Sequence, residues 1–151
     1  MKLKRTKRPA LWSAATLGIL IAGTAVRLPG QSSQEEAAAK NIIHGKYLID
    51  NAVLCVDCHT PFNEPGEPDR NRWLQGATLA FAPLQPMPNW AAAGPPIAGL
   101  PGWDDAAAGN FLMTGLDTSG KPASRPMPQF RLSRSDAVAM VAYLKSLKPA
   151  N

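Results

Sequence analysis

The spacing of apolar and polar residues predicts three helices separated by long stretches without a regular period. The first helix is expected over about residues 34–54. It opens with a capping box formed by Ser33 and Glu36, and a run of alanines follows, which favours helix. Its apolar positions are Ile42, Ile43, Leu48, Ile49, Val53 and Leu54. These positions are consistent with one buried helical face.

The second and third helices are marked by their end signals. Asp104 is a good N-cap residue, residues 106–114 read as a short helix, and Gly115 suits the position after its last turn. The last helix is expected to begin after Ser133 and to stop at Pro149. Its apolar stripe consists of Ala137, Met140, Val141 and Leu144. These three segments make an all-α fold the expectation.

Irregular chain fills the space between the predicted helices. Residues 61–102 contain nine prolines and five glycines, and residues 116–132 contain three more prolines. Neither stretch alternates apolar and polar positions as a strand would. Long structureless stretches are unusual in a compact domain. A large bound group resolves the conflict, because loop side chains can then be buried against that group.

Candidate chemistry is concentrated in Cys55-Val56-Asp57-Cys58-His59, which contains both cysteines of the chain. The spacing C-x-x-C-H is the attachment signature of a c-type haem. Cysteines three positions apart project from one side of a helical turn. There they can form thioethers with two vinyl groups on one porphyrin edge, while His59 binds the iron. The motif therefore predicts one covalently attached haem c.

Other interpretations of the motif are less favoured. A zinc site would need His44 or another group as fourth ligand, and the adjacent Cys58 and His59 rarely reach one tetrahedral ion. A thiol-disulfide pair belongs at a helix N-terminus, where the dipole lowers the thiol pKa. Here the motif is expected to end the first helix, directly before Thr60-Pro61. A structural disulfide or a chance match is the remaining alternative.

The second axial ligand of an electron-transfer haem is most often Met or His. His44, the only other histidine, lies on the incoming helix and is expected to be a surface or packing residue. Met113 and Met140 lie on helical patterns, where packing is the favoured role. Met87 and Met127 both lie in loops between two prolines. Local sequence alone does not separate these two methionines.

Residues 35–148 resemble the class I cytochrome c family, and most closely its single-haem bacterial domains. The matching segments are Gly45-Lys46-Tyr47-Leu48, Cys55-Val56-Asp57-Cys58-His59-Thr60-Pro61, Pro126-Met127-Pro128 and Tyr143-Leu144-Lys145-Ser146-Leu147. The resemblance implies a cytochrome c-like fold, in which about three main helices and long loops wrap around one covalently bound haem.

The resemblance also implies roles for particular residues. Met127, in the late loop, would be the distal iron ligand opposite His59. The first and last helices would cross at Gly45, packed by Tyr143. The carbonyl of Pro95 or of Pro96 would accept a hydrogen bond from the imidazole of His59, which fixes the orientation of the ring.

The segment 62–90 departs from the family because it is longer than a minimal cytochrome needs. It contains Trp73 and Trp90, which could cover the haem or dock a partner, although filling the loop core is the favoured role. By position alone, Trp103 and Arg125 are candidates to reach the haem propionates.

The first 26 residues resemble an export segment. Five basic residues lie within residues 2–8, and a run of 17 residues without charge follows from Ala10 to Val26. Gly23-Thr24-Ala25 resembles the pattern before a cleavage site, while the length of the run is at the lower limit for crossing a bilayer. We expect a signal peptide or an N-terminal membrane anchor over residues 1–26 and a linker over 27–34. Either form places the domain outside the cytoplasm.

The charge distribution argues against a nucleic-acid partner. The formal net charge of +5 comes from the N-terminus, because residues 27–151 hold eleven basic and eleven acidic residues. No basic stripe with interleaved aromatic residues follows. A nearly neutral domain also provides no strong field to steer a charged partner.

The sequence therefore predicts a periplasmic or otherwise extracytoplasmic mono-haem c-type cytochrome. It would pass single electrons between redox partner proteins. Residues 10–26 would provide any association with a membrane. No group is placed for acid–base or nucleophilic catalysis, so a carrier is expected instead of an enzyme, although it could serve as the cytochrome subunit of a dehydrogenase or oxidase. The alternative is a haem enzyme or ligand sensor with an open sixth position.

Overall fold

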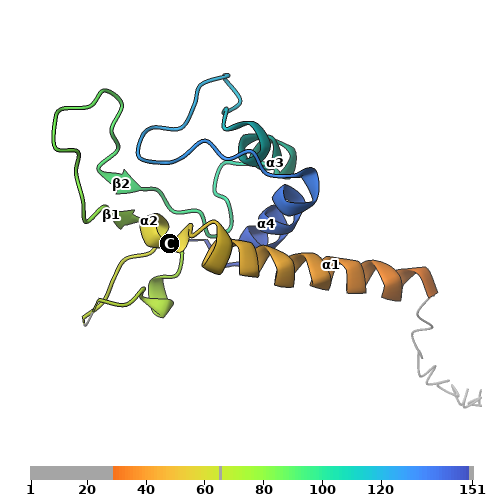
Figure 1. Cartoon of the computed structure of the whole chain (residues 1–151). Coiled ribbons are helices and arrows are strands. Elements are labelled where there is room, and N and C mark those ends of the chain that lie inside the picture. Colours follow the sequence, from red (N-terminus) through yellow and green to blue (C-terminus); the bar gives the residue numbers. More distant parts are fainter. Residues whose placement is uncertain (1–28, 65, 150–151) are drawn as a thin grey trace, which may run out of the picture.

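The computed structural model describes residues 29–64 and 66–149, and Figure 1 shows their arrangement. The elements, in chain order, are α1 (Pro29–Tyr47), the π-helical turn η1 (Leu48–Ala52), α2 (Val56–His59), the 3-10 turn η2 (Arg70–Arg72), β1 (Ala77–Thr78), β2 (Ala93–Gly94), α3 (Asp105–Thr114) and α4 (Arg134–Ser146). Helices joined by long loops predominate, which confirms the predicted fold class.

The export segment expected over residues 1–26 lies outside the described residues. Among the helices of the described part, none combines the length and the apolar character needed to cross a membrane.

Helix α1 begins earlier than the sequence predicts. It starts at Pro29, so the stretch 27–34 is helical from its third residue and is not a linker there. Ser33 does not cap the helix, because its hydroxyl donates to the carbonyl of Gly30 at 3.0 Å. Glu36 instead pairs with Lys40 one turn later, at 2.9 Å. Proline is well suited to a first helical position, which explains the earlier start.

The end of the first helix also differs from the prediction. After Tyr47 the chain continues as the π-helical turn η1, in which the amide of Val53 donates to the carbonyl of Leu48 at 2.7 Å. Leu54 then adopts a left-handed conformation with φ of 58°, which stops the helix. Cys55 is the N-cap residue of the separate helix α2. The expectation that the cysteine motif ends the first helix is therefore wrong.

Helices α3 and α4 confirm the predicted end signals. The carboxylate of Asp104 accepts from the amide of Ala107 at 2.7 Å, and Gly115 closes α3 with φ of 73°. Ser133 caps α4 by accepting from the amide of Asp136 at 3.2 Å. Helix α4 ends at Ser146, three residues before Pro149.

Two short strands were not predicted. β1 and β2 pair antiparallel, with Ala77 opposite Gly94 and Thr78 opposite Ala93. They close the base of a loop, residues 79–92, that projects away from the helices in Figure 1. Two-residue strands are too short to show an alternating pattern, so the sequence carries no signal for them.

The first and last helices cross at Gly45, as the family resemblance implies. A Cβ atom at this position would overlap the backbone carbonyl of Ala139 in α4. Tyr143, one turn further along α4, is buried beneath Lys46, whose ammonium lies 5.8 Å from the ring centre. The indole of Trp73 donates to the Tyr143 hydroxyl at 3.1 Å, which ties the long segment 62–90 to this crossing.

The core lies where the π-helical turn, the long segment and α4 meet. Ile49, Leu74 and Met140 are fully buried there. Leu74 is held on both sides of its backbone: its amide donates to the Thr60 hydroxyl at 3.0 Å, and its carbonyl accepts from the amide of Ile97 at 2.9 Å. The long segment thus contributes to the core and is not only a surface excursion.

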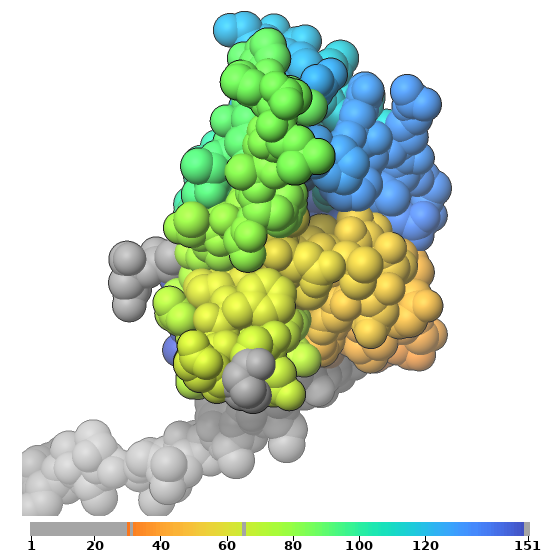
Figure 2. All heavy atoms as spheres, turned by 60° about the vertical axis from the view of Figure 1, so that its left-hand side comes forward, coloured from red at the N-terminus to blue at the C-terminus, as the bar shows by residue number. Residues whose placement is uncertain are grey.

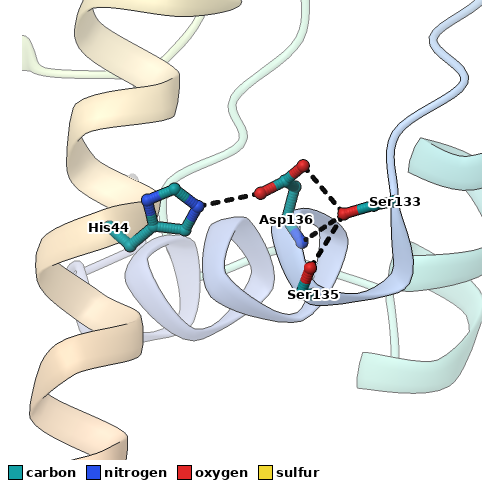
Figure 3. A network of polar contacts seen from close by, with 4 residues as sticks. All are labelled: His44, Ser133, Ser135 and Asp136. Atoms are coloured by element: carbon teal, nitrogen blue, oxygen red, sulfur yellow. Dashed lines mark hydrogen bonds and ion pairs between the residues drawn. The ribbon is translucent and has the colours of Figure 1, made fainter.

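A polar contact joins the two crossing helices outside the core. His44 of α1 donates from Nε2 to the carboxylate of Asp136 at 2.8 Å, and Asp136 also accepts from the Ser133 hydroxyl at 2.8 Å (Figure 3). Both hydrogen bonds hold the pKa of the Asp136 carboxyl below its usual value, and the bond from His44 has the larger effect. His44 thus faces the start of α4, in agreement with its expected packing role.

We expect Gly45→Ala to destabilise the protein. The added methyl group forces α1 away from the carbonyl of Ala139, and overpacking of this kind costs about 1–3 kcal/mol. The free energy of unfolding in urea measures the effect. Gly30→Ala in the same helix is the control, because nothing lies within 4 Å of that position. Equal stabilities for the two variants would contradict a close crossing at Gly45.

Asp136→Asn should weaken the protein at neutral pH and lose this effect in acid. Because the folded-state pKa of Asp136 is lowered, its contribution is complete above the ordinary aspartate pKa of about 4 and disappears as the pH falls through the folded value. Thermal unfolding midpoints of wild type and variant, measured from pH 6 down to pH 2, should converge at the acid end. A constant difference across that range would show that the carboxylate charge is not involved.

Candidate functional site

A cavity of about 810 Å³ lies between α2, α3, α4 and the loops that connect them. Its apolar lining includes Ile97, Leu100, Phe111, Leu112, Phe130 and Leu144. Cavities that hold cofactor-sized ligands span roughly 300–1,000 Å³ and are mostly apolar with a few polar groups. The loops that looked too long for a compact domain form much of this wall, which is the arrangement expected if they surround a large group.

Both cysteines line the cavity from α2. Cys55 precedes the first residue of this helix and Cys58 lies three residues later, so the two side chains leave the same turn. Both side chains are half-buried, and they do not form a disulfide with each other. The arrangement offers two sulfur atoms to one edge of a group held in the cavity.

The electrostatics of the thiols argue against thiol-disulfide chemistry. The motif begins a helix after all, which is where reactive C-x-x-C pairs are found. However, burial raises the pKa of Cys55 to about 12, and burial together with the Asp57 charge raises the pKa of Cys58. A redox-active pair needs the opposite shift, because the thiolate is the nucleophile. The argument against a thiol-disulfide pair therefore rests on the burial of the thiols and no longer on their place along a helix.

A tetrahedral zinc site is not supported either. His44, the proposed fourth ligand, is bonded to Asp136 at the crossing of α1 and α4. Within the described ranges, no group of three or more His, Cys, Asp or Glu side chains is placed to hold a metal ion.

His59 is held from two sides at the cavity wall. Its side chain is buried, and Nδ1 donates to the carbonyl of Pro95 at 2.7 Å. Its own backbone carbonyl accepts from the amide of Gly76 at 2.8 Å. Of the two prolines left open by the sequence, Pro95 therefore makes the bond. Burial lowers the pKa of His59, which favours the neutral ring. With its proton on Nδ1, the ring keeps its lone pair on Nε2, the atom needed to bind a metal.

The cavity distinguishes the two candidate methionines, which local sequence alone does not. Met127 is half-buried and lines the cavity, whereas Met87 is 39% exposed on the loop 79–92 and is not among the lining residues. Met140 also reaches the wall, from a fully buried position on α4. Met113 packs against the core without reaching the wall.

The aromatic and basic residues singled out by position have different surroundings. Trp103 lines the cavity, but Arg125 does not, and its backbone carbonyl accepts from the amide of Ala91 at 2.6 Å. Neither Trp73 nor Trp90 reaches the wall. Trp73 packs against the core, and Trp90 stacks edge-to-face on Phe81, so both fill loop structure, as the favoured interpretation holds.

The sequence did not reveal the role of Gly94, which lies beside His59 in the folded chain. A Cβ at Gly94 would overlap the carbonyl of Cys58 and lie 3.2 Å from Nδ1 of His59. The segment that carries Pro95 can therefore approach α2 only if residue 94 lacks a side chain. The glycine directly before Pro95 is the sequence signal that could have indicated this close approach.

Comparisons with known proteins identify relatives of this chain. A family model for cytochrome c matches residues 42–148. The cytochrome subunit of fructose dehydrogenase from Gluconobacter japonicus is 30% identical over 112 residues, covering 68% of this chain and 21% of that protein. A diheme c-type cytochrome from Cereibacter sphaeroides is 29% identical over 107 residues, covering 67% of this chain and 33% of that protein. The chain thus spans about a fifth to a third of the length of these relatives.

Gly94→Ala should loosen the hold on the His59 side chain at the cavity wall. The methyl group displaces Pro95 from α2, which lengthens the bond to Nδ1 of His59. We expect a loss of about 1–3 kcal/mol in unfolding free energy, typical of overpacking, and a shifted Nδ1 proton resonance. Gly109→Ala is the control, because nothing lies within 4 Å of that position outside its own helix. An unchanged His59 resonance in Gly94→Ala would contradict the assigned role.

Proposed function

Because this chain belongs to the cytochrome c family, we propose that it carries one covalently attached haem c and transfers single electrons outside the cytoplasm. In this proposal Cys55 and Cys58 form the two thioethers. His59 is the proximal iron ligand and Met127 the distal one.

The observation that carries the proposal is the convergence of these four residues on one cavity. Cys55, Cys58, His59 and Met127 come from α2 and from a loop almost 70 residues later, yet all of them line the same space. The orientation of the His59 imidazole also supports the proposal, because its hydrogen bond to Pro95 leaves Nε2 available to bind a metal. The size and apolar lining of the cavity fit a porphyrin, and the donor set fits iron.

The count of one haem rests on the cysteines. The chain has two cysteines, and both belong to the single C-x-x-C-H motif. The relative described as diheme is about three times as long as the part that this chain matches. One haem for this chain is therefore consistent with a relative that holds two.

Bound haem iron supplies a reversible couple that takes up one electron and gives up one electron. The residues of this chain tune it. The Pro95 carbonyl holds the His59 proton and strengthens Nε2 as a donor. A thioether from Met127 favours the ferrous state, because soft sulfur stabilises the lower charge and raises the reduction potential. Apolar walls restrict the access of water to the iron.

The sequence and the relatives support a proposal for the location and for the partners. The basic and apolar N-terminal pattern supports export, and thioether attachment of haem in bacteria takes place outside the cytoplasm. One relative is the cytochrome subunit of fructose dehydrogenase. We therefore propose redox proteins as donor and acceptor, with a dehydrogenase among the candidates for the donor.

Met127→Ala should convert the iron from a low-spin to a high-spin state. Loss of the thioether opens the sixth position and lowers the reduction potential by on the order of 100 mV, within the roughly 0.8 V that axial ligands cover. Absorbance spectra of oxidised and reduced holoprotein report the spin state, and spectra recorded during a redox titration give the reduction potential. Met87→Ala is the matched control, because this methionine also lies between two prolines but outside the cavity wall.

Other outcomes would change the proposal. A spectrum that does not respond to Met127→Ala would favour the haem enzyme or ligand sensor with an open sixth position. A response to Met87→Ala instead would move the distal ligand to that loop. Intact mass after denaturation tests the thioethers, since a haem-sized increment must persist. Loss of the increment would refute covalent attachment.

A further inference from the structure

The loop between β1 and β2 has an unusual surface. From Trp73 to Trp103 the chain contains no Asp, Glu, Lys or Arg in 31 consecutive positions. Three large apolar side chains of the loop 79–92 are exposed: Phe81 by 52%, Leu84 by 100% and Met87 by 39%. Apolar patches at the surface often mark interaction sites, and these three side chains all lie on this one loop.

The loop is held in shape at its base. Thr78 pairs with Ala93, and the amide of Leu79 donates to the carbonyl of Ala92 at 2.9 Å. Above them the rings of Phe81 and Trp90 stack edge-to-face with centres 5.9 Å apart. Pro83, Pro86 and Pro88 restrict the tip. A surface that is ordered in advance loses little conformational entropy when it binds.

The loop is continuous with the cavity. Leu79, Ala91 and Ala93 line the cavity wall, and the amide of Ala91 donates to Arg125 of the segment that carries Met127. Figure 2 shows the green residues of the loop as a ridge beside the blue residues that follow α3. A protein that covers this ridge therefore rests next to the candidate haem site, where electrons must cross.

We propose that the loop 79–92 is the docking surface for a redox partner protein with an apolar, uncharged patch. The inference rests on the proposed function, because it concerns where electrons leave or enter the domain. With no charge on the loop there is no pairing to gain from a charged partner, whose groups would lose water without compensation. Association through this surface depends little on salt, unlike steering by charged patches.

Other occupants fit less well. Helix α1 begins, at Pro29, at the end of the described part that is remote from the loop in Figure 1, so the start of this helix is not placed to cover the loop. A lipid surface is also less suitable, because residues 73–103 offer no lysine or arginine to anionic headgroups. A second copy of this chain presents the same uncharged patch, which makes it a usable probe for transient docking.

The test measures electron self-exchange between oxidised and reduced holoprotein by NMR, each copy probing the other. We expect an exchange rate that changes little between about 0.05 and about 0.5 M NaCl. Over this range the screening of exposed charges increases strongly, so docking through charged groups would respond to it. Leu84→Glu should lower the rate about tenfold or more, because each encounter loses leucine burial and places two carboxylates face to face. Ile43→Glu is the control, because Ile43 is 70% exposed on α1, away from the loop.

Several results would overturn the proposal. Equal rates for Leu84→Glu and Ile43→Glu would remove the loop from the interface, and a strong salt dependence of the wild type would point to charged docking. A stable dimer by sedimentation would make a second copy the occupant. Binding to phosphatidylcholine vesicles that Leu84→Glu abolishes would assign the loop to lipid.

The haem spectrum of each variant distinguishes these results from failure of the proposed function. Failure of the proposed function would show as absent haem or altered ligation.

Discussion

The structure depends on the hydrogen bond from His59 to the carbonyl of Pro95, which joins two sides of the cavity wall. This bond ties α2, with both cysteines, to the chain that leaves β2 some 36 residues later. Gly94 permits the contact, and the Gly76 amide holds the histidine backbone from the other direction. One imidazole thereby ties together the helix that carries the cysteines, the orientation of its own Nε2 atom and the course of the long segment.

The rest of the fold supports this arrangement with little regular structure. The crossing of α1 and α4 at Gly45 supplies a close helix pair, and Met140 of α4 contributes both to the core and to the cavity wall. Loop residues complete the wall. The cytochrome c family to which the chain belongs accounts for this space, because membership implies a bound haem.

The sequence predicted those features that depend on local interactions. The ends of α3 and α4 follow from Asp104, Gly115 and Ser133, whose caps act within one turn. The π-helical turn and the left-handed Leu54 were missed, because tertiary packing imposes them against local preference. The two methionines flanked by prolines illustrate the same limit. Their neighbours in sequence are alike, and only the folded chain places Met127, not Met87, on the wall.

The short ladder of β1 and β2 has a consequence for the variability of the domain. The contacts of His59 with Gly76 and with Pro95 lie on the near side of this ladder. Leu79 and Ala91, just beyond it, still line the cavity wall, whereas the tip of the loop between them makes no bond to the histidine. Chains of other lengths or chemistries could replace this tip without displacing His59, so it is a natural graft point at which evolution or protein engineering can exchange the exposed surface.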